Sequence, residues 1–208
     1  MLGLFLSAFI TFFVIVDPPG CVPIYASLTK GANAAQRRSM AIRATAAAAG
    51  ILFVFALFGE KLLAALHIEL NSFRIAGGIM LFLIAIDMVF EKRTERREER
   101  AQKIIDTPEI EDVSIFPMAM PMIAGPGSIA SVMLLMSQNE GIERASIILS
   151  ALGGVLLLTL LALLAAGPIM RLLGAQAEAV ITRLLGVLLA ALAAQFVIDG
   201  LRTSFGFA

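Results

Sequence analysis

Six long stretches of this chain contain no charged residue, and this pattern restricts the chain to a helical fold inside a lipid bilayer. Lipid offers no hydrogen-bond partners, so a chain that crosses it must pair its own backbone groups in helices or in a closed barrel. Apolar runs this long favour helices. With 59% hydrophobic and 15% charged residues among 208, the composition is also unlike that of a soluble domain. The uncharged stretches are Met1–Val16, Ala44–Gly59, Ile75–Ile86, Val113–Asn139, Ala145–Met170 and Leu184–Ile198.

Several stretches are shorter than the roughly 20 residues that a perpendicular helix needs to cross the bilayer. We extend them into flanks where long basic side chains can reach the interface. The chain is therefore expected to be an all-α polytopic membrane protein with six transmembrane helices. The first apolar run has no basic region ahead of it, so we interpret it as a retained span and not as a signal peptide. The predicted spans are Leu2–Leu28, Ala41–Leu66, Phe73–Phe90, Ile115–Met136, Ala145–Ile169 and Leu184–Leu201.

An internal repeat is the second constraint, because a proline-glycine pair interrupts the apolar run at the start of each half. Three spans in each half make the second half enter the membrane in the opposite sense to the first. We therefore expect a 3+3 inverted repeat whose first and fourth helices are broken. Residues 1–90 form the first repeat, 91–114 a charged cytoplasmic linker and 115–208 the second repeat. Three landmarks keep their order at an offset of about 108 residues: Pro19/Pro126, Gly59/Gly167 and Arg74/Arg183.

The first break contains Asp17, near the middle of the first predicted span. A carboxylate at a bilayer centre costs at least about 2.5–3.5 kcal/mol, so such a residue is a functional hypothesis by default. Asp17, Pro19 and Gly20 are candidate substrate-binding or coupling residues, and Tyr25 follows in the same half-helix. A structural alternative stays open, in which Asp17 caps a second half-helix that begins at Pro18.

The second break has no acidic residue, since Ala124 occupies the position equivalent to Asp17. Its residues Gly125, Pro126, Gly127 and Ser128 could expose backbone N–H groups at a half-helix N-terminus, where an anion or a polar substrate group would bind. The alternative is a kink that only improves packing. If the motif is functional, the two breaks should meet in a shared polar cavity near the bilayer midplane.

Four further polar residues are weaker candidates. Asp87 and Gln195 could line a cavity, although Asp87 could equally lie at the cytoplasmic interface. Arg74 and Arg183 begin equivalent helices, where they would either reach the interface or form gating ion pairs. Asp87 is a third possible gating residue.

The sequence contains no nucleotide-binding loop, no cluster of metal ligands and no catalytic dyad. A thiol-disulfide relay needs two exchangeable thiols, and the chain has one cysteine. We therefore expect no enzymatic activity, no cofactor, no metal and no nucleic-acid partner. The expected partners are the lipid bilayer and an unknown small-molecule substrate, and a homo-oligomer is compatible with the sequence.

Three segments resemble the signature segments of the MarC family of bacterial inner-membrane proteins. The resemblance covers essentially the whole chain and implies six spans in a bacterial inner membrane. It also implies kinship with the LysE-type exporter superfamily, which moves amino acids and other small solutes and includes thiol-electron carriers of the DsbD type. The family pattern more often has a polar residue other than cysteine at position 21, so no cysteine-dependent activity is implied. The segments are Asp17–Gly20 with Pro23, Arg74–Gly78 and Pro121–Gly127.

These observations lead us to expect a secondary transporter or exporter of a small polar solute. The alternative is a structural or regulatory membrane protein that transports nothing.

The distribution of basic residues predicts the orientation of the chain, because lysine and arginine accumulate in cytoplasmic loops. Both termini should be periplasmic and the 91–114 linker cytoplasmic. A cysteine introduced at Glu98 should resist a membrane-impermeant thiol reagent in intact cells, whereas a cysteine at Glu69 should react. Reaction at Glu98 with protection at Glu69 would reverse the predicted orientation.

Overall fold

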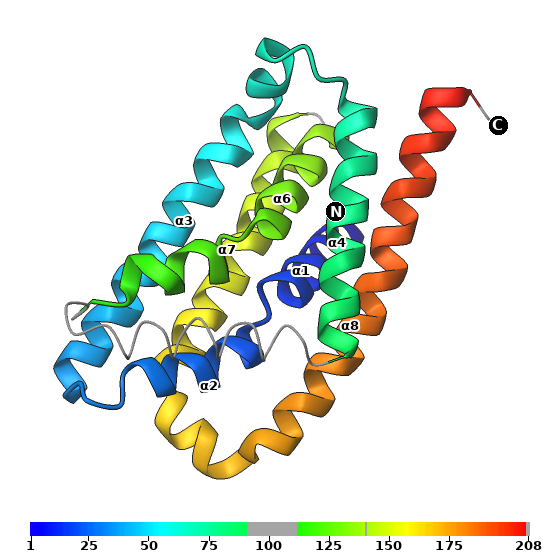
Figure 1. Ribbon diagram of the computed structural model, residues 1–208. Coiled ribbons are helices and arrows are strands. Elements are labelled where there is room, and N and C mark those ends of the chain that lie inside the picture. Colours follow the sequence, from blue (N-terminus) through cyan, green and yellow to red (C-terminus); the bar gives the residue numbers. More distant parts are fainter. Residues whose placement is uncertain (91–111, 140, 207–208) are drawn as a thin grey trace.

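The computed structural model describes residues 1–90, 112–139 and 141–206, apart from the side chains of residues 171–178. The predicted linker 91–114 lies outside the described residues except for its last three positions. Within the described residues, the elements are helices (Figure 1). They are α1 (Leu2–Val16), α2 (Pro18–Leu28), α3 (Ala34–Ala65), α4 (Leu70–Val89), η1 (Ser114–Ile123), α6 (Pro126–Gln138), α7 (Ile142–Leu164) and α8 (Ala166–Phe205).

The prediction of an all-α polytopic membrane protein is confirmed. Within the described residues, five helical segments are long and apolar enough to cross a membrane, and the bent pair of η1 and α6 makes a sixth. The first segment, Leu2–Leu28, has the predicted bounds and consists of α1 and α2. Both expected breaks are present, one at Asp17 and one at Ala124.

Capping residues place the start of α3 and the end of α8 outside the predicted spans. Helix α3 begins before the predicted Ala41, because Asn33 and Gln36 form a capping box in which each side chain bonds the other's backbone N–H at 2.9 Å. Helix α8 also extends well beyond the predicted Leu184–Leu201 and ends at Gly206, whose φ of 65° suits glycine.

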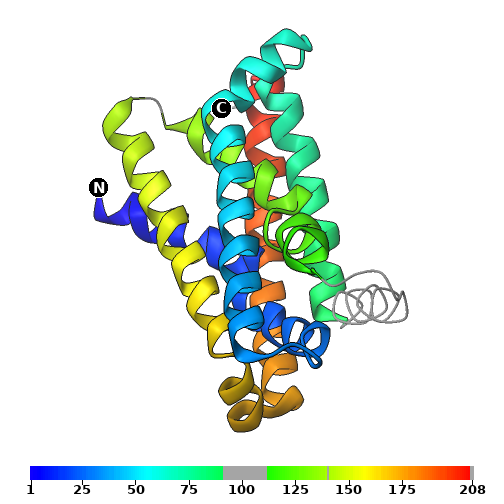
Figure 2. The same cartoon turned by 90° about the vertical axis from the view of Figure 1, so that its left-hand side faces the viewer.

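The long helices run in opposite directions in the two halves of the chain. Figure 1 shows α3 antiparallel to α7 and α4 antiparallel to α8, and Figure 2 shows the same directions from the side. Helices α4 and α8 lie against each other over much of their length.

Contacts between the two halves occur in matched pairs. Helix α1 of the first half packs on α7, and η1 of the second half packs on α3. Helix α2 packs on α7 and α8 of the second half. In the same way, α6 packs on α3 and α4 of the first half. Two halves related by a two-fold rotation would give this pattern. The superposition of the halves stays a prediction, and so do their bounds as domains.

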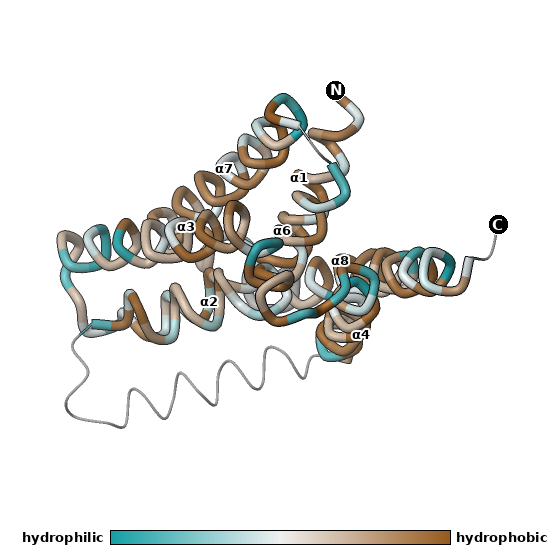
Figure 3. The backbone as a smooth tube through the Cα atoms, turned by 90° about the horizontal axis from the view of Figure 1, so that it is seen from above, coloured by the Kyte–Doolittle hydropathy of each residue, from teal (hydrophilic) through white to brown (hydrophobic). Residues whose placement is uncertain are grey.

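Many apolar side chains are exposed on the bundle, and Figure 3 shows that its helices consist mostly of hydrophobic residues. Exposed side chains of this kind suit contact with lipid tails. The buried side chains form a large cluster around α3 and α7 and a smaller one between α4, α6 and α8. Exposed apolar residues include Phe53, Val54, Leu57 and Phe58 on α3, Leu83 on α4 and Leu157 and Leu161 on α7.

Glycines bring α4 and α8 into close contact. A Cβ atom on Gly78 would lie 2.7 Å from Val197 Cγ2 and 2.9 Å from the carbonyl oxygen of Ala193. A Cβ atom on Gly186 would lie 2.8 Å from Met88 Cβ. Small residues at these positions let the two backbones approach, which is how helices associate in lipid.

We expect Gly78→Ala to destabilise the protein, because the added methyl group meets a backbone carbonyl that cannot move aside. The loss should be about 1–2 kcal/mol, which exceeds the gain in helix propensity. Thermal unfolding in detergent can be followed with a thiol-reactive dye, because buried Cys21 becomes reactive on unfolding. Gly50→Ala is the matched control, since no atom lies within 4 Å of its Cβ position. An unfolding midpoint for Gly78→Ala at or above that of Gly50→Ala would contradict the close packing.

Candidate functional site

The first break is closed by its own residues. Asp17 ends α1 in the left-handed conformation, with φ 57° and ψ 65°, and its buried carboxylate Oδ1 accepts a hydrogen bond from the N–H of Gly20 at 3.1 Å. Pro18 and Pro19, the first two residues of α2, have no N–H to satisfy. The Asp17 cap and the Pro18 helix start expected from the sequence are therefore both present.

Gly20 is fitted tightly to this cap. A Cβ atom there would lie 2.2 Å from Asp17 Oδ2, so any side chain would displace the carboxylate. The N–H of Cys21 bonds the carbonyl oxygen of Asp17 at 3.1 Å, which begins the regular hydrogen bonding of α2. The first turn of α2 thus needs no partner from solvent or solute.

Tyr25 has a structural contact one turn further on. Its hydroxyl donates to the carbonyl oxygen of Arg37 on α3. The Arg37 side chain in turn donates from Nε to the carbonyl oxygens of Thr29 and Ala32, at 3.1 and 3.0 Å. Together these bonds hold the turn between α2 and α3.

The second break is built differently. The η1 segment has wide helical turns with extended backbone at Phe116 and Met120, and it meets α6 at a bend of 53°. The hydroxyl of Ser128 donates to the carbonyl oxygen of Ile123 at 2.8 Å, which satisfies one acceptor freed by the break. No side chain caps the start of α6 at Gly125.

Two backbone donors at the start of α6 are left over. Pro126 has no N–H, whereas Gly127 and Ser128 have N–H groups that form no hydrogen bond within the described residues. Both residues are buried. Unpaired amides at a helix N-terminus carry the positive end of the helix dipole, so they favour an anionic or strongly accepting group.

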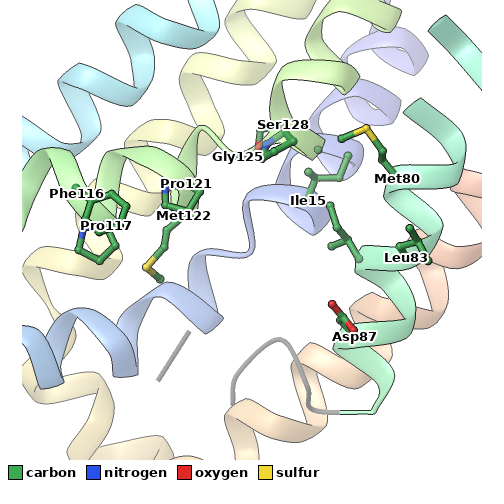
Figure 4. A pocket seen from close by; sticks show the side chains of 13 residues that line it. Ile15, Met80, Leu83, Asp87, Phe116, Pro117, Pro121, Met122, Gly125 and Ser128 are labelled. Carbon is green, nitrogen blue, oxygen red and sulfur yellow. The ribbon is translucent and has the colours of Figure 1, made fainter. Parts of the chain in front are cut away.

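These amides border a cavity of about 640 Å³ between α1, α4, η1 and α6. Figure 4 shows the α6 turn at one side of the cavity and Asp87 of α4 at another. The remaining wall is mostly apolar, so polar groups are concentrated at the α6 turn and at Asp87. The cavity is lined by Ile15, Met80, Leu83, Ile84, Asp87, Phe116, Pro117, Pro121, Met122, Gly125, Pro126, Gly127 and Ser128.

One face of α4 forms a wall of the cavity, and this wall was not predicted from the sequence. Met80, Leu83, Ile84 and Asp87 follow the spacing of a single helical face. That spacing places Asp87 on one face with three apolar residues, but it does not distinguish a cavity wall from a face that contacts lipid. Asp87 is half-buried and lies within this wall.

The structure brings together only some of the predicted site residues. The Gly125–Ser128 turn and Asp87 share the cavity, whereas Asp17, Pro19, Gly20 and Tyr25 are not among its lining residues. Gln195 lies on an exposed part of α8, where its Nε2 donates to Asp199 Oδ1 at 2.7 Å. A cavity shared by the two breaks and a coupling role for Asp17 therefore stay predictions.

The predicted gating residues are spread over the bundle. Arg74 and Asp87 lie at opposite ends of α4, about 20 Å apart along the helix at 1.5 Å per residue. Arg183 is exposed on α8. Their roles in gating are untested and stay predictions.

An ion pair joins the two halves near the start of η1. Arg43 Nη1 of α3 lies 2.8 Å from Asp112 Oδ2. The N–H of Ser114 donates to Asp112 Oδ1 at 3.0 Å. The nearby Ser114 residue and the charge of Arg43 hold the pKa of the Asp112 carboxyl below its usual range. Among the residues that the structure describes, no group of acidic, histidine or cysteine side chains is arranged to hold a metal ion.

The fold and its two broken spans define the protein as a polytopic α-helical integral membrane protein. The chain belongs to the MarC family of integral membrane proteins, whose family model matches residues 2–205. The sequence resemblance to this family is thereby confirmed, and the match extends over nearly the whole chain.

Relatives with similar sequences are found in bacteria and archaea. The UPF0056 inner membrane protein YhgN of Escherichia coli K12 is 35% identical over 199 residues, covering 95% of each chain. The UPF0056 membrane protein YvbG of Bacillus subtilis is 33% identical over 205 residues, covering 99% of this chain and 97% of the relative. A UPF0056 membrane protein of Archaeoglobus fulgidus is 35% identical over 201 residues, covering 96% and 93%. No solved structure matches the chain.

These findings support a multi-pass inner-membrane protein. The orientation of the two termini stays a prediction.

Two substitutions at Asp17 test whether its cap stabilises the protein. Asp17→Asn keeps an oxygen that accepts from Gly20, and asparagine tolerates the left-handed conformation, so its unfolding midpoint should stay close to that of the wild type. Asp17→Ala leaves the buried Gly20 N–H without a partner and should cost about 2 kcal/mol. The dye-based unfolding assay compares the two variants. Equal midpoints for alanine and wild type would show that the cap contributes nothing to stability.

Proposed function

We propose that the protein is an inner-membrane secondary transporter or exporter of a small polar solute, and that the cavity beside α6 is its solute site. The observation that carries the proposal is the pair of unbonded N–H groups of Gly127 and Ser128 at this cavity. Inside a membrane such groups are costly unless water or a ligand bonds them. A solute with an accepting group would satisfy them.

The chemistry of the cavity suggests the kind of solute. The α6 N-terminus favours an anionic or accepting group, and the Asp87 carboxylate favours a cationic or donating group. Apolar side chains such as Met80 and Met122 surround these polar points. A mostly apolar pocket with a few polar groups is typical of small-molecule sites, and its volume falls within the usual range of about 300–1,000 Å³.

The difference between the two breaks supports this assignment. Both breaks interrupt a span, but Asp17 satisfies the first internally, whereas the equivalent residue Ala124 has no group that could cap α6. A break that served packing alone would gain stability from a similar cap. The uncapped turn instead lies at a cavity, which is where transporters with broken helices bind their substrates.

The matched contacts between the halves support a mechanism of alternating access. Under this proposal the two halves are an inverted repeat and rock about a fixed site, so that the cavity opens to either side in turn. Asp17 lies two residues after Ile15, which lines the cavity, and we propose that it couples this motion to proton binding. The gating assignments of Arg74 and Arg183 form part of the same proposal.

A substrate-panel uptake assay in proteoliposomes, with and without a proton gradient, tests the function. For a solute that enters, Asp87→Asn should reduce the rate at least about tenfold, because it removes a charge from the solute site. Glu60→Gln is the matched control, since Glu60 is an exposed carboxylate on α3 outside the cavity and should not affect uptake. Asp17→Asn should abolish or uncouple transport while leaving the fold intact.

Two results would contradict the proposal. Uptake by Asp87→Asn at the wild-type rate would remove the cavity from the mechanism. Failure of every solute in the panel to enter, in either direction, would favour the alternative of a membrane protein with a structural or regulatory role.

A further inference from the structure

A second pocket, of about 380 Å³, lies away from the cavity beside α6. It forms where the beginning of α4 and the ends of α6 and α8 come together, at the upper end of the bundle in Figure 1. In the predicted orientation this end faces the periplasm. Every residue that lines the pocket is polar or charged: Arg74, Gln138, Asp199, Arg202 and Thr203.

Close helix packing creates this pocket. A Cβ atom on Gly200 of α8 would lie 2.7 Å from Ile75 Cγ1 and 3.2 Å from the carbonyl oxygen of Asn71, both on α4. The absence of a side chain at Gly200 therefore lets the last turns of α8 approach the first turns of α4. Arg202 is thereby placed near Arg74, and the two guanidinium groups border one pocket.

Both arginines lack a partner within the described residues. Neither forms an ion pair or a side-chain hydrogen bond there, and Arg74 Nε is buried without any acceptor. A buried donor that bonds neither protein nor water is costly, and more so when it belongs to a charged group. A long side chain reaching the membrane interface would explain where the Arg74 head group lies, but it would not provide an acceptor for Nε.

The carboxylate in the pocket does not meet this need. Asp199 Oδ1 accepts from Gln195 Nε2 at 2.7 Å, and the Thr203 hydroxyl donates to the backbone carbonyl oxygen of Asp199 at 2.8 Å. The two arginines and this one acid leave the pocket with one excess positive charge. An anion that bonds both guanidinium groups would balance the charge and also satisfy Arg74 Nε.

We propose that this pocket binds a phosphate-type oxyanion between Arg74 and Arg202. Guanidinium groups present N–H donors in a planar fork that matches phosphate oxygens, and two such forks at one pocket suit a group with several oxygens. The oxyanion could belong to the headgroup of an anionic lipid, since the pocket is at an end of the bundle, or to free phosphate in solution. A lipid headgroup and free phosphate would both present phosphate oxygens to the arginines.

Two binding experiments distinguish these sources, and both use the full-length protein in a neutral detergent. The first is an equilibrium titration with inorganic phosphate at constant ionic strength, with chloride as the reference anion. The second is native mass spectrometry with phosphatidylglycerol in competition with phosphatidylcholine. We expect specific binding of at least one of the two phosphate probes. Binding of the lipid alone identifies a headgroup site, and binding of phosphate alone identifies a site for a soluble anion.

Variants assign the binding to the pocket. Arg74→Gln and Arg202→Gln should each weaken binding at least about tenfold, since each removes a charged donor. Arg144→Gln is the matched control, because Arg144 is an exposed arginine that does not line the pocket, and it should bind as wild type. Asp199→Asn should bind more tightly than wild type, because it removes the opposing charge and keeps an acceptor for Gln195. This variant tests the pocket by a gain of affinity, which unfolding cannot produce.

Three outcomes would overturn the proposal. The first is that neither probe binds to the wild-type protein above the reference anion or lipid. The second is that Arg74→Gln and Arg202→Gln both bind as the wild type does. The third is that Arg144→Gln weakens binding as much as the pocket variants, which would indicate general surface attraction.

Discussion

A backbone group inside a membrane has to find its hydrogen-bond partner in protein or in trapped water, and both broken spans of this protein are shaped by that requirement. At the first break, two prolines remove two donors and the Asp17 carboxylate takes the third. At the second break, one proline removes one donor, Ser128 satisfies a carbonyl oxygen, and the amides of Gly127 and Ser128 remain unbonded within the described residues. Only the second break therefore needs a partner that the described residues do not provide, and the proposed solute site depends on this difference.

The bundle around the breaks gives the unsatisfied amides a place to act. Close contact between α4 and α8 at Gly78 and Gly186 holds α4 in place, and one face of α4 then forms a wall of the cavity beside the α6 turn. The same helix pair, drawn together at Gly200, forms the arginine-lined pocket at its other end. Two polar sites of different character are thus positioned by a single glycine-dependent helix contact. One is a mostly apolar cavity with an acid and a helix N-terminus, and the other is a polar pocket with two guanidinium groups.

Much of this architecture could be predicted from the sequence, because membrane constraints are strict. Uncharged runs predicted the spans, and the proline-glycine pairs predicted the breaks. The cap at Asp17 followed from the order Asp17-Pro18, which suits a helix start. The wall formed by α4 could not be recognised in the same way. Lipid-facing and cavity-facing side chains are both apolar in a membrane helix, so Met80 and Leu83 look no different from residues that contact lipid. The absence of Asp17 from the cavity also depends on a tertiary arrangement that spacing along the chain does not encode.

We infer that the first break is sealed by its own cap, whereas the second is open to water or solute. Amide hydrogen exchange in protein labelled with ¹⁵N-glycine and reconstituted in nanodiscs measures this directly. We expect slow exchange at Gly20, whose N–H bonds Asp17, and much faster exchange at Gly127, whose N–H has no partner in the described structure. Equally slow exchange at both glycines would show instead that the second break is also sealed.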